Sequence, residues 1–217
     1  MYSILAFECG PVATNCYLVG DTDAKLAFLV DAPKESLSIV LDTLASRGWK
    51  LTEILLTHTH WDHTADCHEL QLATGARVVV HAEDVYRLTD PMKHTIWPLP
   101  FTIQAVTDFE TISGTEGHLH VLGEAGKIKW VHTPGHTEGG VCFIDELHSV
   151  VYAGDTLFAG SIGRTDLPGG DMKTLCDSIH QVLFCLPDPT TVFPGHGPIT
   201  TIGDEKISNP FVGLLAS

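Results

Sequence analysis

The segment with the most metal-binding chemistry is residues 57–63, which read Thr-His-Thr-His-Trp-Asp-His. Imidazole nitrogens and carboxylate oxygens are ligands for zinc, iron and manganese alike. If the chain is extended at His58, residues two apart point the same way, so His58 and His60 can bind one cation. Asp62 and His63 then lie where the chain turns into the next helix, within reach of a second position close by.

Three shorter segments place similar side chains at the ends of predicted strands. His136 and His196 each lie on a glycine turn that follows a strand, and Asp155 follows another strand. A carboxylate has two oxygens and can bridge two cations, which suits Asp155 to a shared position. Any one of these residues alone is typical of an ordinary surface or turn side chain. Several such residues, each at the end of a predicted strand, together indicate a metal site.

The elements around the motif follow from apolar periodicity and turn residues. Short apolar runs separated by Gly-Pro and Gly-Asp predict an antiparallel start to the chain. The motif itself lies between a strand and a helix of a predicted β-α-β unit. The elements predicted for the first half are strands over residues 3–7, 15–19, 26–30, 53–56 and 77–80, and helices over residues 35–47 and 65–74.

The second half is richer in strands. Residues 91–117 carry several prolines and are predicted to be irregular, with a strand or two. The elements predicted after them are strands over residues 119–122, 128–131, 141–144, 150–152 and 190–192, and helices over residues 171–186 and 202–207. No Pro-, Gly- or Ser-rich linker divides the halves. We therefore predict one domain over residues 1–217 with an α+β fold, in which two mixed sheets pack face to face with helices outside.

Composition narrows the class of protein. The 217 residues are 44% hydrophobic and 18% charged, which is typical of a globular chain with a sizeable core. A formal net charge of −15 disfavours binding to nucleic acid or to an anionic membrane surface. No signal peptide or membrane-spanning stretch is predicted, so we expect a cytoplasmic protein. Six cysteines without a C-x-x-C pair indicate reduced thiols rather than a disulfide framework.

The order His-x-His-x-Asp-His, Gly-His, Gly-Asp and Pro-Gly-His-Gly resembles that of the metallo-β-lactamase superfamily, whose fold is an αββα sandwich. The matching motifs span residues 58–197. The resemblance implies two divalent metal ions, with zinc expected first and iron or manganese as alternatives. The implied ligand sets are His58, His60 and His136 for one metal and Asp62, His63 and His196 for the other, with Asp155 and a water bridging both.

Residues 154–166 narrow the resemblance to the glyoxalase II-like hydroxyacylglutathione hydrolases and the persulfide dioxygenases. True β-lactamases commonly carry cysteine where this chain has Asp155. The Ser-Asn-Pro-Phe at residues 208–211 is similar to the short, single-domain glyoxalase II-like proteins of bacteria. Because the sequence stops at residue 217, we expect no C-terminal helical domain of the kind that binds glutathione in full-length glyoxalase II.

Arg164 falls where glyoxalase II places a cationic glutathione contact. A planar guanidinium can hold a carboxylate through two hydrogen bonds, so Arg164 is a candidate substrate-binding residue. The alternative is an internal salt bridge to Asp166 or to another carboxylate of the loop.

These features predict a metal-dependent hydrolase of a small-molecule thioester, such as S-D-lactoylglutathione or a related acyl-thiol, by attack of a metal-bound hydroxide. Asp62 and Asp155 would be the catalytic carboxylates. One alternative is a persulfide dioxygenase with a single iron held by His58, His136 and Asp155. A further alternative is a non-catalytic metal-binding protein. No oligomeric state is predicted.

Overall fold

The first three strands form the antiparallel arrangement that the turn residues predict. The computed structural model describes residues 2–123 and 126–214. Within it the chain divides into two compact units, each described by itself below. The N-terminal unit comprises the residues up to Ile112 together with His120–Lys127. The C-terminal unit comprises Ser113–Leu119 and the residues from Ile128 onward.

The N-terminal unit is built on a mixed six-stranded sheet in the order β1-β2-β3-β4-β5-β6. The first two pairings along it are antiparallel and the next three are parallel. The strands are β1 (Tyr2–Cys9), β2 (Thr14–Asp21), β3 (Leu26–Val30), β4 (Lys50–Leu55), β5 (Arg77–His81) and β6 (Glu110–Ile112).

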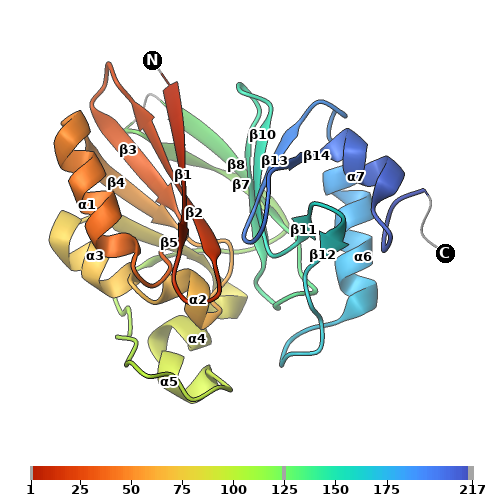
Figure 1. Ribbon diagram of the computed structural model, residues 1–217, viewed down its shortest axis with the longest axis horizontal. Helices are drawn as coiled ribbons and strands as arrows, with labels where there is room; N and C mark the ends of the chain where they lie inside the picture. The colour runs from red at the N-terminus through yellow and green to blue at the C-terminus, as the bar shows by residue number, and fades with distance from the viewer. Residues whose placement is uncertain (1, 124–125, 215–217) are drawn as a thin grey trace. The chain divides into compact units, whose positions relative to one another are not determined.

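Two helices, α1 (Ser36–Arg47) and α3 (Cys67–Thr74), lie along this sheet, as Figure 1 shows. They bury one apolar face against it, because Val40 of α1 and Leu70 of α3 belong to the same core cluster as Leu29 and Ile54 of the strands. All four side chains are fully buried. Parallel strands need such crossover helices, so the spacing of apolar residues and the sheet topology agree here.

One helix prediction in this unit is wrong at its start. The helix predicted over residues 65–74 begins at Cys67 as α3, and a separate short helix, α2 (Trp61–Thr64), precedes it. The chain leaves helical geometry at Asp66, whose backbone N–H bonds the carbonyl of Ala32. The carboxylate of Asp66 also accepts hydrogen bonds from Lys34 and from the backbone of Leu37. These long-range contacts override the local helical pattern.

The region between β5 and β6 is more helical than the sequence suggests. It holds the 3-10 turn η1 (Ala82–Asp84) and the short helices α4 (Val85–Thr89) and α5 (Pro91–His94). These helices are only five and four residues long, so they carry too little periodicity to be recognised from the sequence.

A second mixed sheet has the order β14-β13-β10-β9-β8-β7 and belongs to the C-terminal unit, apart from the residues of β7 and β8 that fall within His120–Lys127. Strand β10 pairs with β13 in parallel and with β9 in antiparallel fashion. The strands are β7 (Glu116–Val121), β8 (Gly126–His132), β9 (Val141–Asp145), β10 (Val150–Gly154), β13 (Thr191–Pro194) and β14 (Thr200–Thr201), with a separate hairpin of β11 (Leu157–Phe158) and β12 (Ser161–Ile162).

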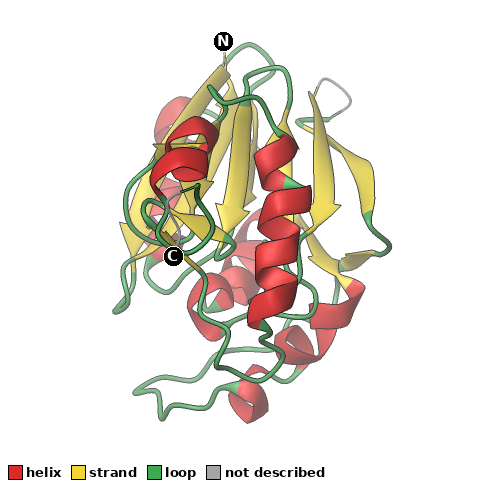
Figure 2. Ribbon diagram, turned by 90° about the vertical axis from the view of Figure 1, so that its right-hand side faces the viewer, coloured by secondary structure: helices red, strands yellow, loops and turns green. Residues whose placement is uncertain are grey.

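Helices α6 (Met172–Gln181) and α7 (Ile202–Ser208) pack on this sheet, and Figure 2 shows α6 running in front of its strands. Leu175 and Ile179 of α6 share a core cluster with Cys142 and Val192 of the sheet. The helix predicted to reach residue 186 ends at Gln181 and continues as the 3-10 turn η2 (Leu183–Cys185).

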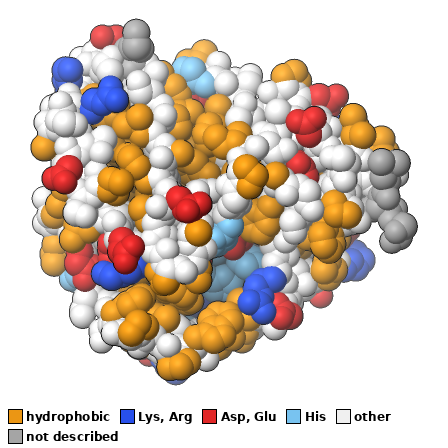
Figure 3. Space-filling model, viewed as in Figure 1, with side chains coloured by type: hydrophobic (Ala, Val, Ile, Leu, Met, Phe, Trp, Pro, Cys, Tyr) orange, Lys and Arg blue, Asp and Glu red, His pale blue; other side chains and the backbone are white. Residues whose placement is uncertain are grey.

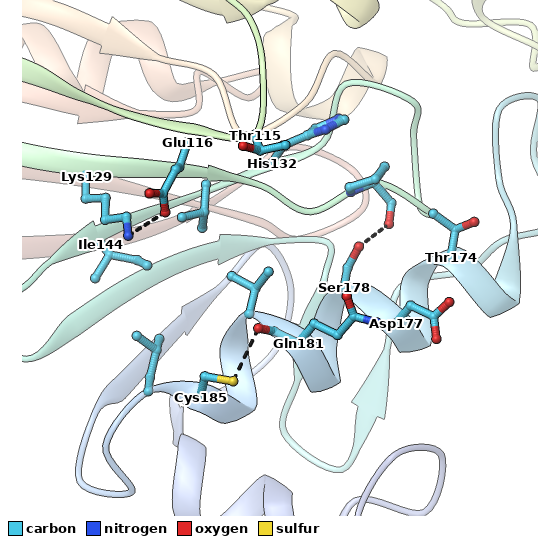
Figure 4. A pocket seen from close by; sticks show the side chains of 14 residues that line it. Thr115, Glu116, Lys129, His132, Ile144, Thr174, Asp177, Ser178, Gln181 and Cys185 are labelled. Carbon is cyan, nitrogen blue, oxygen red and sulfur yellow. Dashed lines mark hydrogen bonds and ion pairs between the residues drawn. The ribbon is translucent and has the colours of Figure 1, made fainter.

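A pocket of about 580 Å³ opens in the C-terminal unit beside α6 (Figure 4). Its charged lining is paired, since Lys129 Nζ lies 2.7 Å from a carboxylate oxygen of Glu116. Ser178 of α6 donates a hydrogen bond of 2.7 Å to the carbonyl of Pro134 at its edge. None of the candidate metal ligands lines this pocket.

The surface agrees with the acidic composition. Lys and Arg side chains are few and scattered on the face shown in Figure 3, where histidine side chains also reach the surface. Among the described residues, no helix has the length and apolar character needed to cross a bilayer.

Candidate metal centre

The four ligands predicted in the His-x-His-x-Asp-His motif lie together in the N-terminal unit. The ring centroids of His58 and His60 are 4.9 Å apart, and those of His58 and His63 are 4.1 Å apart. Nε2 of His63 lies 3.5 Å from Oδ2 of Asp62. The rings of His58 and His60 lie together although β4 ends at Leu55. A loop, rather than the strand, brings the rings together.

Helix α2 carries Asp62 and His63, so these two ligands lie on one helical turn instead of ahead of a helix. The turn is closed by the His63 N–H, which bonds the His60 carbonyl at 3.0 Å. The His63 carbonyl in turn accepts a hydrogen bond of 2.8 Å from Ala32, just after β3. The end of a neighbouring strand therefore fixes the position of the ligand turn.

Two of these histidines are oriented through Nδ1. Thr57 Oγ1 lies 3.1 Å from Nδ1 of His58, and Asp31 Oδ2 lies 2.8 Å from Nδ1 of His63. Asp31 also accepts from the backbone N–H and the hydroxyl of Thr57, both at 2.8 Å. A partner on Nδ1 fixes the ring and its tautomer, which directs Nε2 toward a metal.

Asp31 adopts a left-handed backbone conformation, with φ of 58°. Aspartate tolerates this region better than most residues, and strain of this kind collects at functional sites. The backbone N–H of Asp31 bonds the carbonyl of Leu55 at 3.0 Å, so the carboxylate sits directly beside the loop that carries His58.

Two further contacts hold the motif from outside. Thr14 of β2 donates a hydrogen bond of 3.1 Å from its hydroxyl to Oδ2 of Asp62. Between the first two histidines, the N–H of Thr59 bonds Oδ2 of Asp84 at 2.9 Å. Asp84 is itself buried and paired with Arg87 at 3.0 Å. A buried ion pair thus supports the His58–His60 segment from behind.

The remaining three candidate ligands lie together in the C-terminal unit. Oδ2 of Asp155 is 3.4 Å from Nε2 of His136 and 3.6 Å from Nε2 of His196. Asp155 follows β10 and His196 follows β13, and these two strands pair in parallel. The carboxyl ends of paired parallel strands meet at one sheet edge, which is why residues about forty positions apart converge.

His136 is oriented by the loop that follows Asp155. Its Nδ1 lies 2.7 Å from the carbonyl oxygen of Arg164, which leaves Nε2 directed at Asp155. This loop passes so close that a Cβ on Gly163 would overlap the carbonyl oxygen of Asp155. Helix α7 anchors the same loop, because Glu205 accepts the N–H of Gly160 at 2.9 Å.

The guanidinium of Arg164 pairs with Asp166 through two hydrogen bonds, Nε to Oδ1 at 2.7 Å and Nη2 to Oδ2 at 2.8 Å. This pair holds the pKa of the Asp166 carboxyl at about 2. The internal salt bridge considered for Arg164 is therefore present. Binding of a substrate carboxylate by Arg164 stays a prediction.

Four residues that support the candidate ligands were not predicted from the sequence, namely Asp31, Thr14, Asp84 and Gly163. Only Asp31 carries a signal that could have found it. It is an aspartate directly after a predicted strand, which is the same context that identified Asp155. The other three act through contacts between segments far apart in sequence.

Comparison with known proteins supports a metal-binding role. The family described as Metallo-beta-lactamase superfamily matches residues 9–196, a range that includes all seven candidate ligands. An uncharacterised protein of Aquifex aeolicus (strain VF5) is 36% identical over 214 residues, covering 98% of both chains. Hydroxyacylglutathione hydrolase GloC of Haemophilus influenzae is 34% identical over 205 residues, covering 91% of this chain and 92% of its own.

Solved structures agree. BLEG-1 B3 metallo-beta-lactamase is similar with a TM-score of 0.89 and 33% identity, covering 97% of this chain and 99% of its own. TTHA1623 in a di-iron-bound form has a TM-score of 0.82 and 34% identity over 95% and 99% of the two chains. ETHE1 from Myxococcus xanthus has a TM-score of 0.76 and 28% identity over 97% and 84%. These similarities confirm the predicted fold class.

Proposed function

Because the chain belongs to the metallo-β-lactamase superfamily, a group made up mostly of metallo-hydrolases, we propose that it hydrolyses a small-molecule thioester in the manner of glyoxalase II. The observation that carries this proposal is the composition of the two ligand clusters. Each places imidazoles beside a carboxylate: Nε2 of His63 lies near Asp62, and Nε2 of His136 and of His196 lies near Asp155. Such donors suit divalent zinc, iron or manganese.

The proposed ligand assignment divides the seven residues between two metal ions. By the family resemblance, His58, His60 and His136 would hold one ion, Asp62, His63 and His196 would hold the other, and Asp155 would be available to both. The donor chemistry fits, since neutral imidazole and carboxylate are the usual ligands of such ions. The hydrogen bonds to Nδ1 of His58, His63 and His136 provide the outer support that metal-binding histidines usually have.

When bound, two divalent metals supply a water whose pKa is lowered towards 7 and a Lewis acid for the acyl carbonyl. The chain's own contribution is orientation. Asp62, held by the Thr14 hydroxyl, would hold the second metal and orient the nucleophile. Oδ2 of Asp155 lies within 3.6 Å of Nε2 of His136 and of His196, so these three possible ligand atoms gather around one point.

A thioester is the substrate class whose cleavage needs the least catalytic assistance from these residues. A thiol has an ordinary pKa near 8.5, so the leaving thiolate needs little protonation and no dedicated general acid. The similarity to hydroxyacylglutathione hydrolase GloC supports the same substrate class. Zinc is the first expected metal, and the di-iron form of a protein with 34% identity supports iron as an alternative.

The decisive experiment measures thiol release from S-D-lactoylglutathione by metal-analysed protein, beside His58→Ala and Asp155→Ala variants. We expect the wild-type protein to release thiol and both variants to release none. The Asp155→Ala protein should also lose bound metal. Full activity of Asp155→Ala with two metals bound would contradict the assignment. If the intact, metal-loaded protein releases no thiol, the glutathione thioester is excluded as its substrate.

A persulfide dioxygenase is the second candidate, with one iron held by His58, His136 and Asp155. It is supported by the iron bound in a similar solved structure and by the close pair of His136 and Asp155, 3.4 Å apart. Two histidines and one carboxylate are the ligands of non-haem iron oxygenases. Oxygen consumption with glutathione persulfide, in the absence of thioester cleavage, would favour this function over hydrolysis.

A further inference from the structure

Two cysteines of the N-terminal unit, Cys9 and Cys16, lie on neighbouring strands β1 and β2. In the antiparallel register Cys9 is opposite Thr14, and Phe7 is opposite Cys16. Because alternate residues of a strand share a face, the two cysteines are diagonal neighbours on one face of the sheet. Both side chains belong to the same buried core cluster, and both are free thiols.

The two thiols contact each other. The Cys16 thiol donates a hydrogen bond to the sulfur of Cys9, which lowers the pKa of Cys9 and raises that of Cys16 well above its usual range. Burial opposes ionisation of both thiols, as do the carboxylates of Asp66 and, for Cys9, Glu35. The contact therefore distinguishes a more nucleophilic sulfur from a protonated neighbour.

Access from solvent distinguishes the same two sulfurs. Cys9 is 7% exposed, whereas Cys16 is completely buried. Cys9 directly precedes the turn between β1 and β2, and residues 11–13 of this turn are exposed. A small reagent therefore meets Cys9 before Cys16.

We propose that Cys9 and Cys16 form a modification site that reacts with low-molecular-weight disulfides and closes to an intramolecular disulfide. The Cys9 thiolate attacks one sulfur of the reagent, forming a mixed disulfide and releasing one thiol. The Cys16 sulfur then attacks Cys9, loses its proton and releases the second thiol. Two electrons pass to the reagent, and the two cysteine protons end on the two released thiols.

Closure of this disulfide moves the hairpin. Diagonal neighbours on antiparallel strands are about 7–8 Å apart at Cα, whereas a disulfide joins Cα atoms about 4.4–6.8 Å apart. The strands must shift at Thr14, which faces Cys9 and donates its hydroxyl to Asp62. Oxidation therefore loosens a proposed metal ligand, and this consequence rests on the proposed function, while the disulfide itself does not.

Peptide mapping tests the site in the intact wild-type protein. The first Lys or Arg is Lys25, so one tryptic peptide contains Cys9 and Cys16 and no other cysteine. After incubation with oxidised glutathione, we expect this peptide to lose two hydrogen atoms and to resist alkylation, with full reversal by dithiothreitol. Two of the six thiols should be lost. A peptide that stays doubly alkylated would overturn the proposal.

Two variants separate the roles of the sulfurs. Cys16→Ala should accumulate glutathione on Cys9, whereas Cys9→Ala should leave Cys16 unmodified. Cys185→Ser is the matched control, because Cys185 is exposed and lies in the other unit, and it should form the same link as wild type. Modification of Cys16 in the Cys9→Ala protein would contradict the order of attack.

The consequence is measured separately, by metal affinity in a chelator competition. After oxidation we expect one metal to bind roughly tenfold more weakly. This is the lower end of the usual loss of affinity when a hydrogen bond to a metal ligand is removed. An oxidised protein with unchanged affinity would overturn the link to Asp62 while leaving the modification site intact. Failure of the thioesterase assay would affect neither the mapping nor the affinity measurement.

Discussion

Single hydrogen bonds to Nδ1 orient three of the candidate metal-binding histidines, and Asp31 makes the most consequential of them. Replacing Asp31 with Asn keeps the shape but removes one acceptor, so that His63 and the Thr57 hydroxyl and N–H can no longer all be satisfied. We expect Asp31→Asn to weaken metal binding roughly 10- to 100-fold, the usual loss for such a partner. Chelator competition measures this directly.

Asp166→Asn is the matched control for that substitution. Asp166 is also an aspartate with two hydrogen bonds, but its side chain is exposed and its partner is Arg164. Its metal affinity should equal that of wild type. An Asp31→Asn protein that binds metal as tightly as this control would show that the orientation of His63 is unimportant.

Asp166→Asn also tests the role of Arg164 in binding substrate. The substitution removes the carboxylate that holds the guanidinium, so Arg164 becomes available to a carboxylate of the substrate. We expect KM for S-D-lactoylglutathione to fall roughly two- to fivefold, the range of an exposed ion pair, with kcat unchanged. An acyl-thiol that carries no carboxylate should show no change. If KM for both substrates is unchanged, Arg164 has only the internal role.

Among the loops that carry ligands, the turn before His136 depends most strictly on glycine. Gly135 has φ of 125°, and a Cβ there would overlap the backbone of Leu175 in α6. The Gly135 carbonyl also accepts the N–H of Asp171 at the start of α6. We expect Gly135→Ala to lower the free energy of unfolding by about 3 kcal/mol, because strain and overlap combine. Denaturant unfolding measures the loss.

Gly75→Ala separates strain from overlap. Gly75 ends α3 with φ of 69°, but its surroundings hold nothing within 4 Å of an added Cβ. This substitution should lower the free energy of unfolding by about 1 kcal/mol, because it adds backbone strain without an overlap. Equal losses for the two variants would mean that the contact between the His136 turn and α6 contributes nothing.

Strand β4 contains a buried carboxyl whose titration affects stability. Burial raises the pKa of Glu53, although hydrogen bonds from Thr52 and Leu122 and the charge of Arg77 act in the opposite direction. A raised folded-state pKa means that stability is fully present below the ordinary glutamate pKa and is lost as pH rises through the folded value. At neutral pH the ionised group is therefore a cost.

Glu53→Gln removes that cost while keeping an oxygen to accept from Thr52 and Leu122. We expect the variant to be roughly 0.5–1 kcal/mol more stable at pH 7, the contribution of one buried polar group. The advantage should vanish below pH 4, and unfolding curves at both values check the sign. A variant that is less stable at pH 7 would show that the pairing with Arg77 outweighs burial.

The positions of the candidate ligands at strand ends were predictable, because strand ends are set largely by local sequence. Asp155 and His196 were placed correctly by this logic. The short helix α2 was not predicted, because a single turn has no periodicity of its own and its position is fixed by the hydrogen bond from the Ala32 N–H to the His63 carbonyl. Thr14 and Asp84 were invisible for the same reason, since each reaches the motif from a distant segment.

Charge is the property of the whole chain that bears most on metal binding. The net charge of −15 means that like charges repel throughout the folded protein. The proposed ligand set adds the carboxylates of Asp62 and Asp155, and two divalent cations would offset part of this excess. The metal-free protein should therefore gain more stability from added salt than the metal-loaded protein does.

Metal removal should lower the melting temperature by an amount that linkage predicts. A metal present at about 100 times its Kd contributes about 2.7 kcal/mol per site, which in a chain of this size corresponds to roughly 5–10 °C. We expect a chelator to produce this loss and zinc to restore it in wild type. In His196→Ala, metal should raise the melting temperature only by the amount due to the other site. His118 is an exposed histidine of β7, so His118→Ala should behave as wild type. A melting temperature that chelator and zinc leave unchanged would contradict metal binding by this ligand set, whatever the activity of the protein.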